Sequence, residues 1–190
     1  MSKREEKLRE RLMQAQEKKS IISFSRGFEP GSFTGYVMAL GPKFFVLASL
    51  DDGFKFENYV CLRIRDIEDL EAPAKYEAFY NDVRRLRGDK FPPSPKLDLT
   101  SAASILYSAR KSLVTIHREK LNPDTCVIGY GLSDNAKILE FLEIGPDAKW
   151  DETPSYLRIK DITRIDLPGP YEEALLLVGG KPEALRKKKA

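Results

Sequence analysis

The stretch Leu62-Arg63-Ile64-Arg65-Asp66-Ile67 decides the fold, because it returns as Leu157-Arg158-Ile159-Lys160-Asp161-Ile162, 95 residues later. Upstream, Lys19-Ser20-Ile21-Ile22-Ser23-Phe24 matches Lys111-Ser112-Leu113-Val114-Thr115-Ile116 at a spacing of 92 residues. The second half therefore carries about three extra residues in one loop. Equivalent hydrophobic patterns at a nearly constant spacing predict two equivalent small folds in tandem.

The composition is that of an ordinary soluble globular protein. The chain has 190 residues, of which 42% are hydrophobic and 32% are charged, and its net charge is +3. This charge is too small to require a nucleic-acid partner and does not exclude one. No run of about 18 apolar residues is present, and residues 1–7 lack the apolar segment of a secretion signal. We therefore expect a cytoplasmic protein with no membrane partner.

Side chains that support catalysis or metal binding are scarce. His117 is the only histidine, and without a second histidine or a cysteine motif a zinc site is not predicted. We interpret His117 as structural, and Asp51 and Asp52 as turn residues. Cys61 and Cys126 occupy non-equivalent positions in apolar runs and are expected to be buried free thiols. With no phosphate loop, nucleophile elbow or dinucleotide motif, the sequence predicts no enzyme, no cofactor and no metal.

Periodicity predicts a protein that is mainly β with flanking helices, of the α+β class. A helix over 3–18 has a narrow apolar stripe of Leu8, Leu12 and Ala15. Further helices are predicted over 76–86 and 99–110. Strands are predicted over two sets of five ranges: 20–26, 33–40, 44–50, 58–65 and 67–70, then 113–117, 125–132, 136–142, 155–160 and 162–167.

The same pattern divides the chain into four parts. Residues 1–88 form a first domain with a trailing helix, and residues 96–180 form the second domain. Residues 89–95 hold three prolines and form an extended linker. Residues 181–190 form a basic tail. Tyr76 and Tyr171 occupy matching places after the five strands of each domain and are expected to close its core.

A helix followed by five strands, with almost nothing between the fourth and fifth, resembles the Sm/LSm family. The residues that carry the resemblance are Gly35-Tyr36-Val37, Phe45-Val46-Leu47 and 62–67, with 127–129, 137–139 and 157–162 as their partners. The resemblance covers nearly the whole chain, once per half. It implies two tandem Sm-like five-stranded bent antiparallel barrels, each preceded by an N-terminal helix.

Two departures from the family pattern affect the expected function. RNA-binding members usually place an Asp and an Asn at the second turn, where this chain has Gly41-Pro42-Lys43 and Ser133-Asp134-Asn135. After the fourth strand they carry Arg-Gly, or Lys-His in bacterial members, whereas this chain has Arg65-Asp66 and Lys160-Asp161. The resemblance therefore extends to the fold more than to RNA binding.

A basic patch is nevertheless predicted near the second turn and the end of the fourth strand. If Leu62 and Ile64 face the core, strand alternation turns the intervening basic residues outward. The predicted RNA or ligand contacts are Lys43, Phe44, Arg63, Arg65, Asn135, Arg158 and Lys160. The alternative is an ordinary solvated strand face. Trp150, in the inserted loop, is either an interaction anchor or folds back over the barrel mouth.

Two functions fit these observations. The first is a non-enzymatic scaffold or assembly module that mediates protein–protein contact or self-association through the edge strands of its barrels. The alternative is an RNA-binding Sm-like protein that holds single-stranded RNA on the basic patch.

Overall fold

The computed structural model describes residues 2–134 and 137–182. The first half contains α1 (Lys3–Lys18), β1 (Ile21–Ser25), β2 (Ser32–Leu40), β3 (Phe44–Leu50), β4 (Phe56–Arg63), a 3-10 turn η1 (Ile64–Asp66), β5 (Glu68–Glu71) and α2 (Glu77–Arg87). The second half contains α3 (Ala102–Ser108), β6 (Val114–His117), β7 (Cys126–Asp134), β8 (Ile138–Glu143), β9 (Ser155–Arg158), η2 (Ile159–Asp161), β10 (Arg164–Asp166) and α4 (Pro170–Gly179). The α+β class predicted from the sequence is confirmed.

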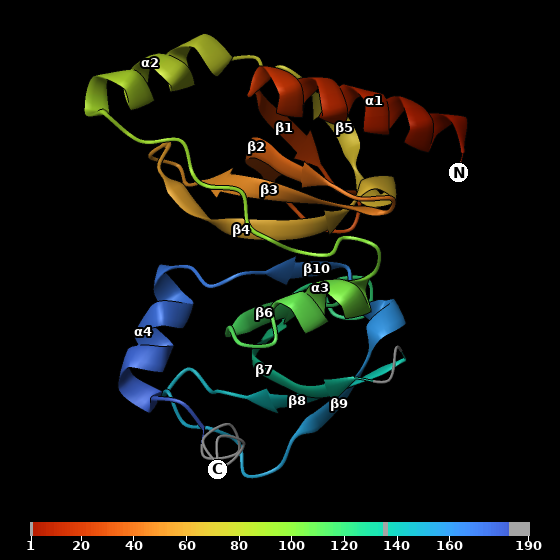
Figure 1. Cartoon of the computed structure of the whole chain (residues 1–190), viewed down its shortest axis with the longest axis vertical. Coiled ribbons are helices and arrows are strands. Elements are labelled where there is room, and N and C mark those ends of the chain that lie inside the picture. Colours follow the sequence, from red (N-terminus) through yellow and green to blue (C-terminus); the bar gives the residue numbers. More distant parts are fainter. Residues whose placement is uncertain (1, 135–136, 183–190) are drawn as a thin grey trace.

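The ten strands form one antiparallel sheet with the order β5-β1-β2-β3-β4-β10-β6-β7-β8-β9. The first five strands and the last five follow the same order, so the duplication seen in the sequence is also present in the topology. The halves join where β4 pairs with β10. Figure 1 shows them stacked along the long axis, with α1 and α2 beside the first half and α4 beside the second.

The closed barrels predicted from the sequence are not formed. Within the described residues, β5 pairs with β1 and β9 pairs with β8, and neither strand has a second partner. The fourth strand of the first half instead pairs with the fifth strand of the other half. The prediction is wrong on this point because the free edge of the fourth strand pairs with a strand of the other half, and not with a strand of its own half.

The two halves match in local detail. Gly35 and Gly129 pair with Ile22 and Val114, which are themselves equivalent residues. A Cβ atom on either glycine would lie 2.1 Å from a carbonyl oxygen of the adjacent strand. The register of the second and third strands of each half shifts two residues further on, at Val37/Ala39 and at Gly131/Ser133. Glycine thus permits the same close strand approach and bend in both halves.

The hydrophobic core continues from one half into the other. One cluster joins Val46, Ala48 and Cys61 to Ile116 and Ile165, all of them buried. A second cluster packs the predicted stripe of α1, namely Leu8, Leu12 and Ala15, against the first half. A third cluster around Leu113 and Tyr130 lies in the second half. Because the largest cluster is shared, we expect the two halves to unfold together.

The helices show where local pattern is a good guide and where it is not. The bounds of α1 agree with the prediction, but α3 is shorter than residues 99–110 because Ser101 caps its first turn by accepting from the Ser104 N–H. Tyr76 and Tyr171 are 57% and 54% exposed, so the prediction that they close the cores is wrong. The linker lies against the first half, where the Tyr59 hydroxyl donates to the Pro93 carbonyl.

Candidate functional site

A cleft of about 510 Å³ opens where the two halves meet, between the turns η1 and η2. Five of the predicted contact residues line it: Lys43, Phe44, Arg63, Arg65 and Lys160. Lys43 lies in the β2–β3 turn, Arg65 in η1 and Lys160 in η2, and all three are exposed. Glu5 of α1 is the acidic residue among those that line it. The structure therefore brings basic groups from both halves into one cleft.

Arg63 does not point outward as predicted. It is 8% exposed, and its guanidinium donates to the carbonyl of Lys160 at 2.9 Å and to the carbonyl of Ile162. Burial lowers the pKa of Arg63, and the nearby charge of Arg65 lowers it further. Strand alternation fails at this residue because β4 ends there and the second half covers the side chain. Arg63 thus ties the end of β4 to η2.

Phe44 lines the cleft but has no free face. Its side chain is 5% exposed and belongs to the core that both halves share. The prediction that Phe44 is available for stacking on a base is therefore wrong. The accessible chemistry of the cleft is the cationic chemistry of Lys43, Arg65 and Lys160, which suits phosphate or carboxylate groups.

The remaining predicted residues lie outside the cleft. Arg158 is exposed at the end of β9, where its Nε donates to Asp161 Oδ2 at 2.6 Å. Asn135 lies outside the described residues. Trp150 folds back onto the second half, because its Nε1 donates to the Gly180 carbonyl at 3.0 Å and its ring stacks on Tyr130. Of the two alternatives for Trp150, the structure shows the folded-back position.

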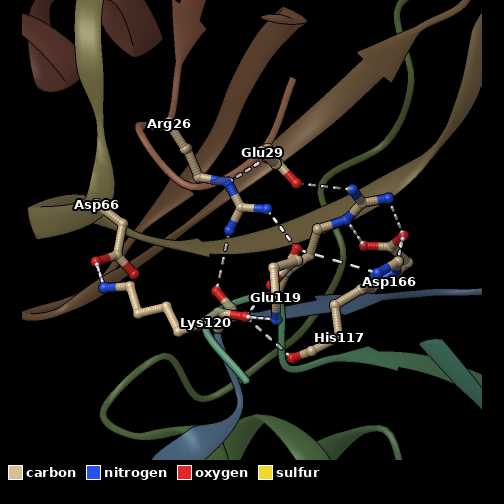
Figure 2. A network of polar contacts seen from close by, with 9 residues as sticks. Arg26, Glu29, Asp66, His117, Glu119, Lys120 and Asp166 are labelled. Carbon is tan, nitrogen blue, oxygen red and sulfur yellow. Dashed lines mark hydrogen bonds and ion pairs between the residues drawn. The ribbon is translucent and has the colours of Figure 1, made fainter. Parts of the chain in front are cut away.

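A buried polar network joins the halves beside the junction, and Figure 2 shows its geometry. Arg26, whose side chain is fully buried, donates to Glu29 and to Glu119 of the other half, both at 2.5 Å. Lys120 in turn donates to Asp66 of the first half at 2.6 Å. Sequence reasoning missed this network. Arg26 and Arg118 are 92 residues apart and so belong to the repeat, but only the fold shows that Arg26 meets Glu29 and Glu119.

Two carboxylates of the junction are held in the charged form. Burial raises the pKa of Glu119, but the hydrogen bond from the Thr163 hydroxyl and the charge of Arg26 outweigh it, so the net shift is downward. Burial likewise raises the pKa of Asp166, and the hydrogen bonds from His117 and Arg164 again outweigh it. Both groups therefore contribute stability above their ordinary pKa values and lose that contribution in acid.

His117 belongs to this network. Its Nε2 lies 3.1 Å from Asp166 Oδ2, and its side chain is 15% exposed. Cys126 faces His117 across the β6–β7 pair and is exposed, whereas Cys61 is buried, so the expectation of two buried thiols holds for one of them. Although the residue is exposed, neighbouring groups partly shield its thiol from water, and this desolvation, with the charge of Asp166, raises the pKa of Cys126. A nucleophilic thiol requires the opposite shift.

Within the described part of the chain, no group of three or more His, Cys, Asp and Glu side chains could hold a metal ion. No described helix combines the length and the apolar character needed to cross a membrane.

The two outer strands of the sheet differ sharply in chemistry. In β5, Glu68, Asp69 and Glu71 are exposed. In β9, Arg158 is exposed and Tyr156 is 69% exposed, and Lys160 follows directly in η2. One end of the sheet is therefore acidic, whereas the other carries cations and an uncovered aromatic ring.

These outer strands are the equivalents of the two strands that join the halves. A shift of 95 residues relates β5 to β10 and β9 to β4. At the junction, Ile165 faces Cys61 and Asp166 faces Val60. The same shift makes Leu70 the equivalent of Ile165, and Tyr156 the equivalent of Cys61. Each outer edge of the sheet is therefore formed by a strand that is equivalent to one of the two strands that pair at the junction.

Comparison of the chain with protein-family models, with curated proteins and with solved structures finds no match.

Proposed function

We propose that this protein is a non-enzymatic assembly module that binds a second copy of itself, β9 of one copy pairing with β5 of the next. The observation that carries the proposal is the β4–β10 junction, because it joins the equivalent strands within the chain. An edge strand presents unpaired backbone groups that serve as a template for another strand. A head-to-tail contact of this kind forms a ring or an open filament, depending on its rotation.

The chemistry of the two edges supports this pairing. The acidic side chains of β5 would approach Arg158 of the second copy. Tyr156 occupies the position that the fully buried Cys61 holds at the internal junction. A second copy would cover the Tyr156 ring and remove its apolar surface from water. Complementary charges would favour this partner over the like-charged pairings β5 with β5 and β9 with β9.

We infer further that each half is an Sm-like unit. The strand order β5-β1-β2-β3-β4, the preceding helix and the 3-10 turn between the fourth and fifth strands support this inference. In each unit, the free edge of the fourth strand pairs with a strand of a neighbour. The neighbour of β4 is the other half, and the neighbour of β9 is a second copy. The unit is therefore open when alone and completed by association.

Light scattering coupled to size-exclusion chromatography over a series of concentrations tests the proposed association. The native chain should show a concentration-dependent increase in mass, and Tyr156→Glu should abolish it by placing an acid opposite the acidic β5. Tyr107→Glu is the matched control, because Tyr107 is 60% exposed on α3 and belongs to neither edge. A constant monomer mass for every form of the chain up to the highest concentration reached, or equal effects of the two substitutions, would contradict the proposal.

A second function, binding of single-stranded RNA, is favoured by the basic cleft between η1 and η2. Lys43, Arg65 and Lys160 converge there from three separate loops and remain exposed. Their positions suit contacts to successive phosphates of a flexible strand, although the burial of Phe44 removes the expected stacking platform. The cleft is therefore proposed to hold the backbone of the strand more than to read its bases.

Fluorescence anisotropy with a labelled single-stranded RNA tests this second function. Binding should weaken steeply as salt is raised, and Arg65→Glu with Lys160→Glu should reduce the affinity by about tenfold or more. Lys149→Glu is the control, because Lys149 is exposed in the inserted loop away from the cleft. Binding that is absent at low salt, or equally weak in the control, would rule out the cleft as an RNA site.

A further inference from the structure

The β5 edge is covered within the chain by two arginines of α1. Arg4 donates to the carbonyl of Arg65 at 3.4 Å and to that of Ile67 at 2.5 Å. Arg11, two helical turns further on, donates to the carbonyl of Leu70 at 2.8 Å. Residues seven apart lie on the same side of a helix, so both arginines reach β5 and η1 from one face of α1.

The carbonyls that Arg4 holds are those a neighbouring unit would use. At the internal junction, Arg63 donates to the carbonyls of Lys160 and Ile162. A shift of 95 residues relates these acceptors to Arg65 and Ile67. Arg4 thus occupies on the first half the place that Arg63 occupies on the second. The equivalent of Arg63 in β9 is Arg158, which is turned back to Asp161 of its own half.

Arg11 likewise donates to a carbonyl that β9 of a second copy would use. At the junction, the Leu167 N–H donates to the Tyr59 carbonyl at 2.8 Å. Ile165 and Cys61 lie opposite each other two residues further along, so alternation makes them the next hydrogen-bonded pair. The equivalent of Ile165 is Leu70, whose carbonyl would then accept from Tyr156 N–H of a second copy. In this chain that carbonyl accepts from Arg11.

The part of α1 that carries Arg4 has no counterpart in the other half. Helix α1 spans 16 residues and begins at Lys3, whereas α3 spans seven residues. The extra turns are present on the half whose fifth strand lies at the open edge, and absent from the half whose fifth strand is covered by β4. A helix laid over an open edge is a known way of blocking edge-to-edge pairing.

We propose that α1 is a latch on the β5 edge, in which Arg4 and Arg11 hold the backbone carbonyls that Arg158 and β9 of a second copy take on assembly. This inference rests on the proposed self-association. Assembly then requires the two arginines to leave their carbonyls, so the hydrogen bonds of the latch oppose association in the free chain. Release of the latch, and not the availability of β9, sets how readily copies join.

The test replaces both arginines by glutamine and measures the dissociation constant of self-association by analytical ultracentrifugation. Arg4→Gln with Arg11→Gln should tighten association by about tenfold or more, since charge-assisted hydrogen bonds no longer have to be broken. Arg9→Gln is the matched control. It removes one positive charge from the same helix, where the double variant removes two, but Arg9 donates to the Gly41 carbonyl and not to β5, so association should change less than about twofold.

The outcomes separate the latch from the assembly itself. Tighter association in the double variant, lost again when Tyr156→Glu is added, supports the latch. Equal or weaker association in the double variant, with Tyr156→Glu still abolishing it, overturns the latch and leaves the assembly standing. No association of any variant at the highest concentration overturns both. Should the double variant lose helical circular dichroism, Arg4→Gln alone gives the same comparison, because Leu8, Leu12 and Ala15 still anchor α1.

Discussion

Replacement of Arg26 by methionine tests whether the buried network holds the two halves together. The substitution keeps an apolar stem of similar length and removes a guanidinium that is fully buried. It deprives the Glu119 carboxylate, 2% exposed, of its countercharge from the other half, and it removes cation–π contacts with Phe28 and Phe33. Removing one partner of a buried ion pair costs about 3–5 kcal/mol. Since whole domains are stable by about 5–15 kcal/mol, the loss should be a large share of the total.

Urea unfolding at neutral pH gives the required free energies. Arg26→Met should lower the unfolding free energy by about 3 kcal/mol or more without changing the slope of the transition. Arg85→Met is the matched control, because Arg85 pairs with Asp82 in solvent with side chains 69% and 64% exposed. Its cost should stay below about 1 kcal/mol. The double variant Arg26→Met with Glu119→Leu should recover part of the loss, since Glu119 is then no longer a buried charge without its arginine.

The pH dependence provides an independent check of the same pair. Glu119 has a lowered pKa in the native fold, so its contribution is present above the unfolded pKa of about 4.3 and is lost as the pH falls through the folded value. Without Arg26, the hydrogen bond from Thr163 opposes the effect of burial without the help of the arginine charge, so the pKa of Glu119 is higher than in the native chain. The difference between native chain and variant should therefore be largest at neutral pH and shrink in acid. A cost equal to that of Arg85→Met, or one independent of pH, would refute this reasoning.

Three further predictions concern the fold and its chemistry. Gly129→Ala should lower the unfolding free energy by about 1–3 kcal/mol, because the new Cβ would lie 2.1 Å from the Leu142 carbonyl oxygen. Gly131→Ala should cost less, because its new Cβ would lie 3.3 Å from a Leu139 methyl group. Urea unfolding of the two variants compares these costs. A thiol reagent should label Cys126 in the native chain and Cys61 only after unfolding, and rapid labelling of both would contradict the buried position of Cys61. Thermal stability of the native chain should fall in acid as Glu119 and Asp166 become protonated, and a flat profile between neutral pH and about pH 3 would contradict their lowered pKa values.

The duplicated pattern was sufficient to predict the order of the five strands in each half and the helix that precedes them. It placed α1 correctly and predicted a short break between the fourth and fifth strands, where the structure has the 3-10 turns η1 and η2, because these features depend on local periodicity and on residues close in sequence. Ile64 and Ile159 are 4% and 6% exposed at equivalent positions. The shared core and the pairing of β4 with β10 could not be predicted in this way. They join residues about 100 positions apart, and no local pattern specifies them.

The same distinction explains the outcome at the candidate site. Alternation correctly predicted that Leu62 and Ile64 are buried and that Arg65 is exposed, because the exposure of each residue depends on the face of its own strand or turn that it occupies. It was wrong for Arg63, because that side chain is covered by η2 from the other half. It gave no indication of Arg26 and Glu119, which meet across the junction. Residues whose role depends on contact between the halves are those that the sequence did not reveal.

Disulfide trapping of the register between two copies tests the central claim most directly. The junction pairs Asp166 with Val60, and the equivalent pair between copies is Glu71 with Ser155. Alternation makes this a non-hydrogen-bonded pair, whose close Cα atoms suit a disulfide. With Cys126 replaced by serine, Glu71→Cys/Ser155→Cys should form disulfide-linked oligomers under mild oxidation. Glu71→Cys/Arg158→Cys, about 10 Å out of register, should not. Absence of linked species in the first variant, or equal linkage in both, would contradict the claim that copies join as the halves do.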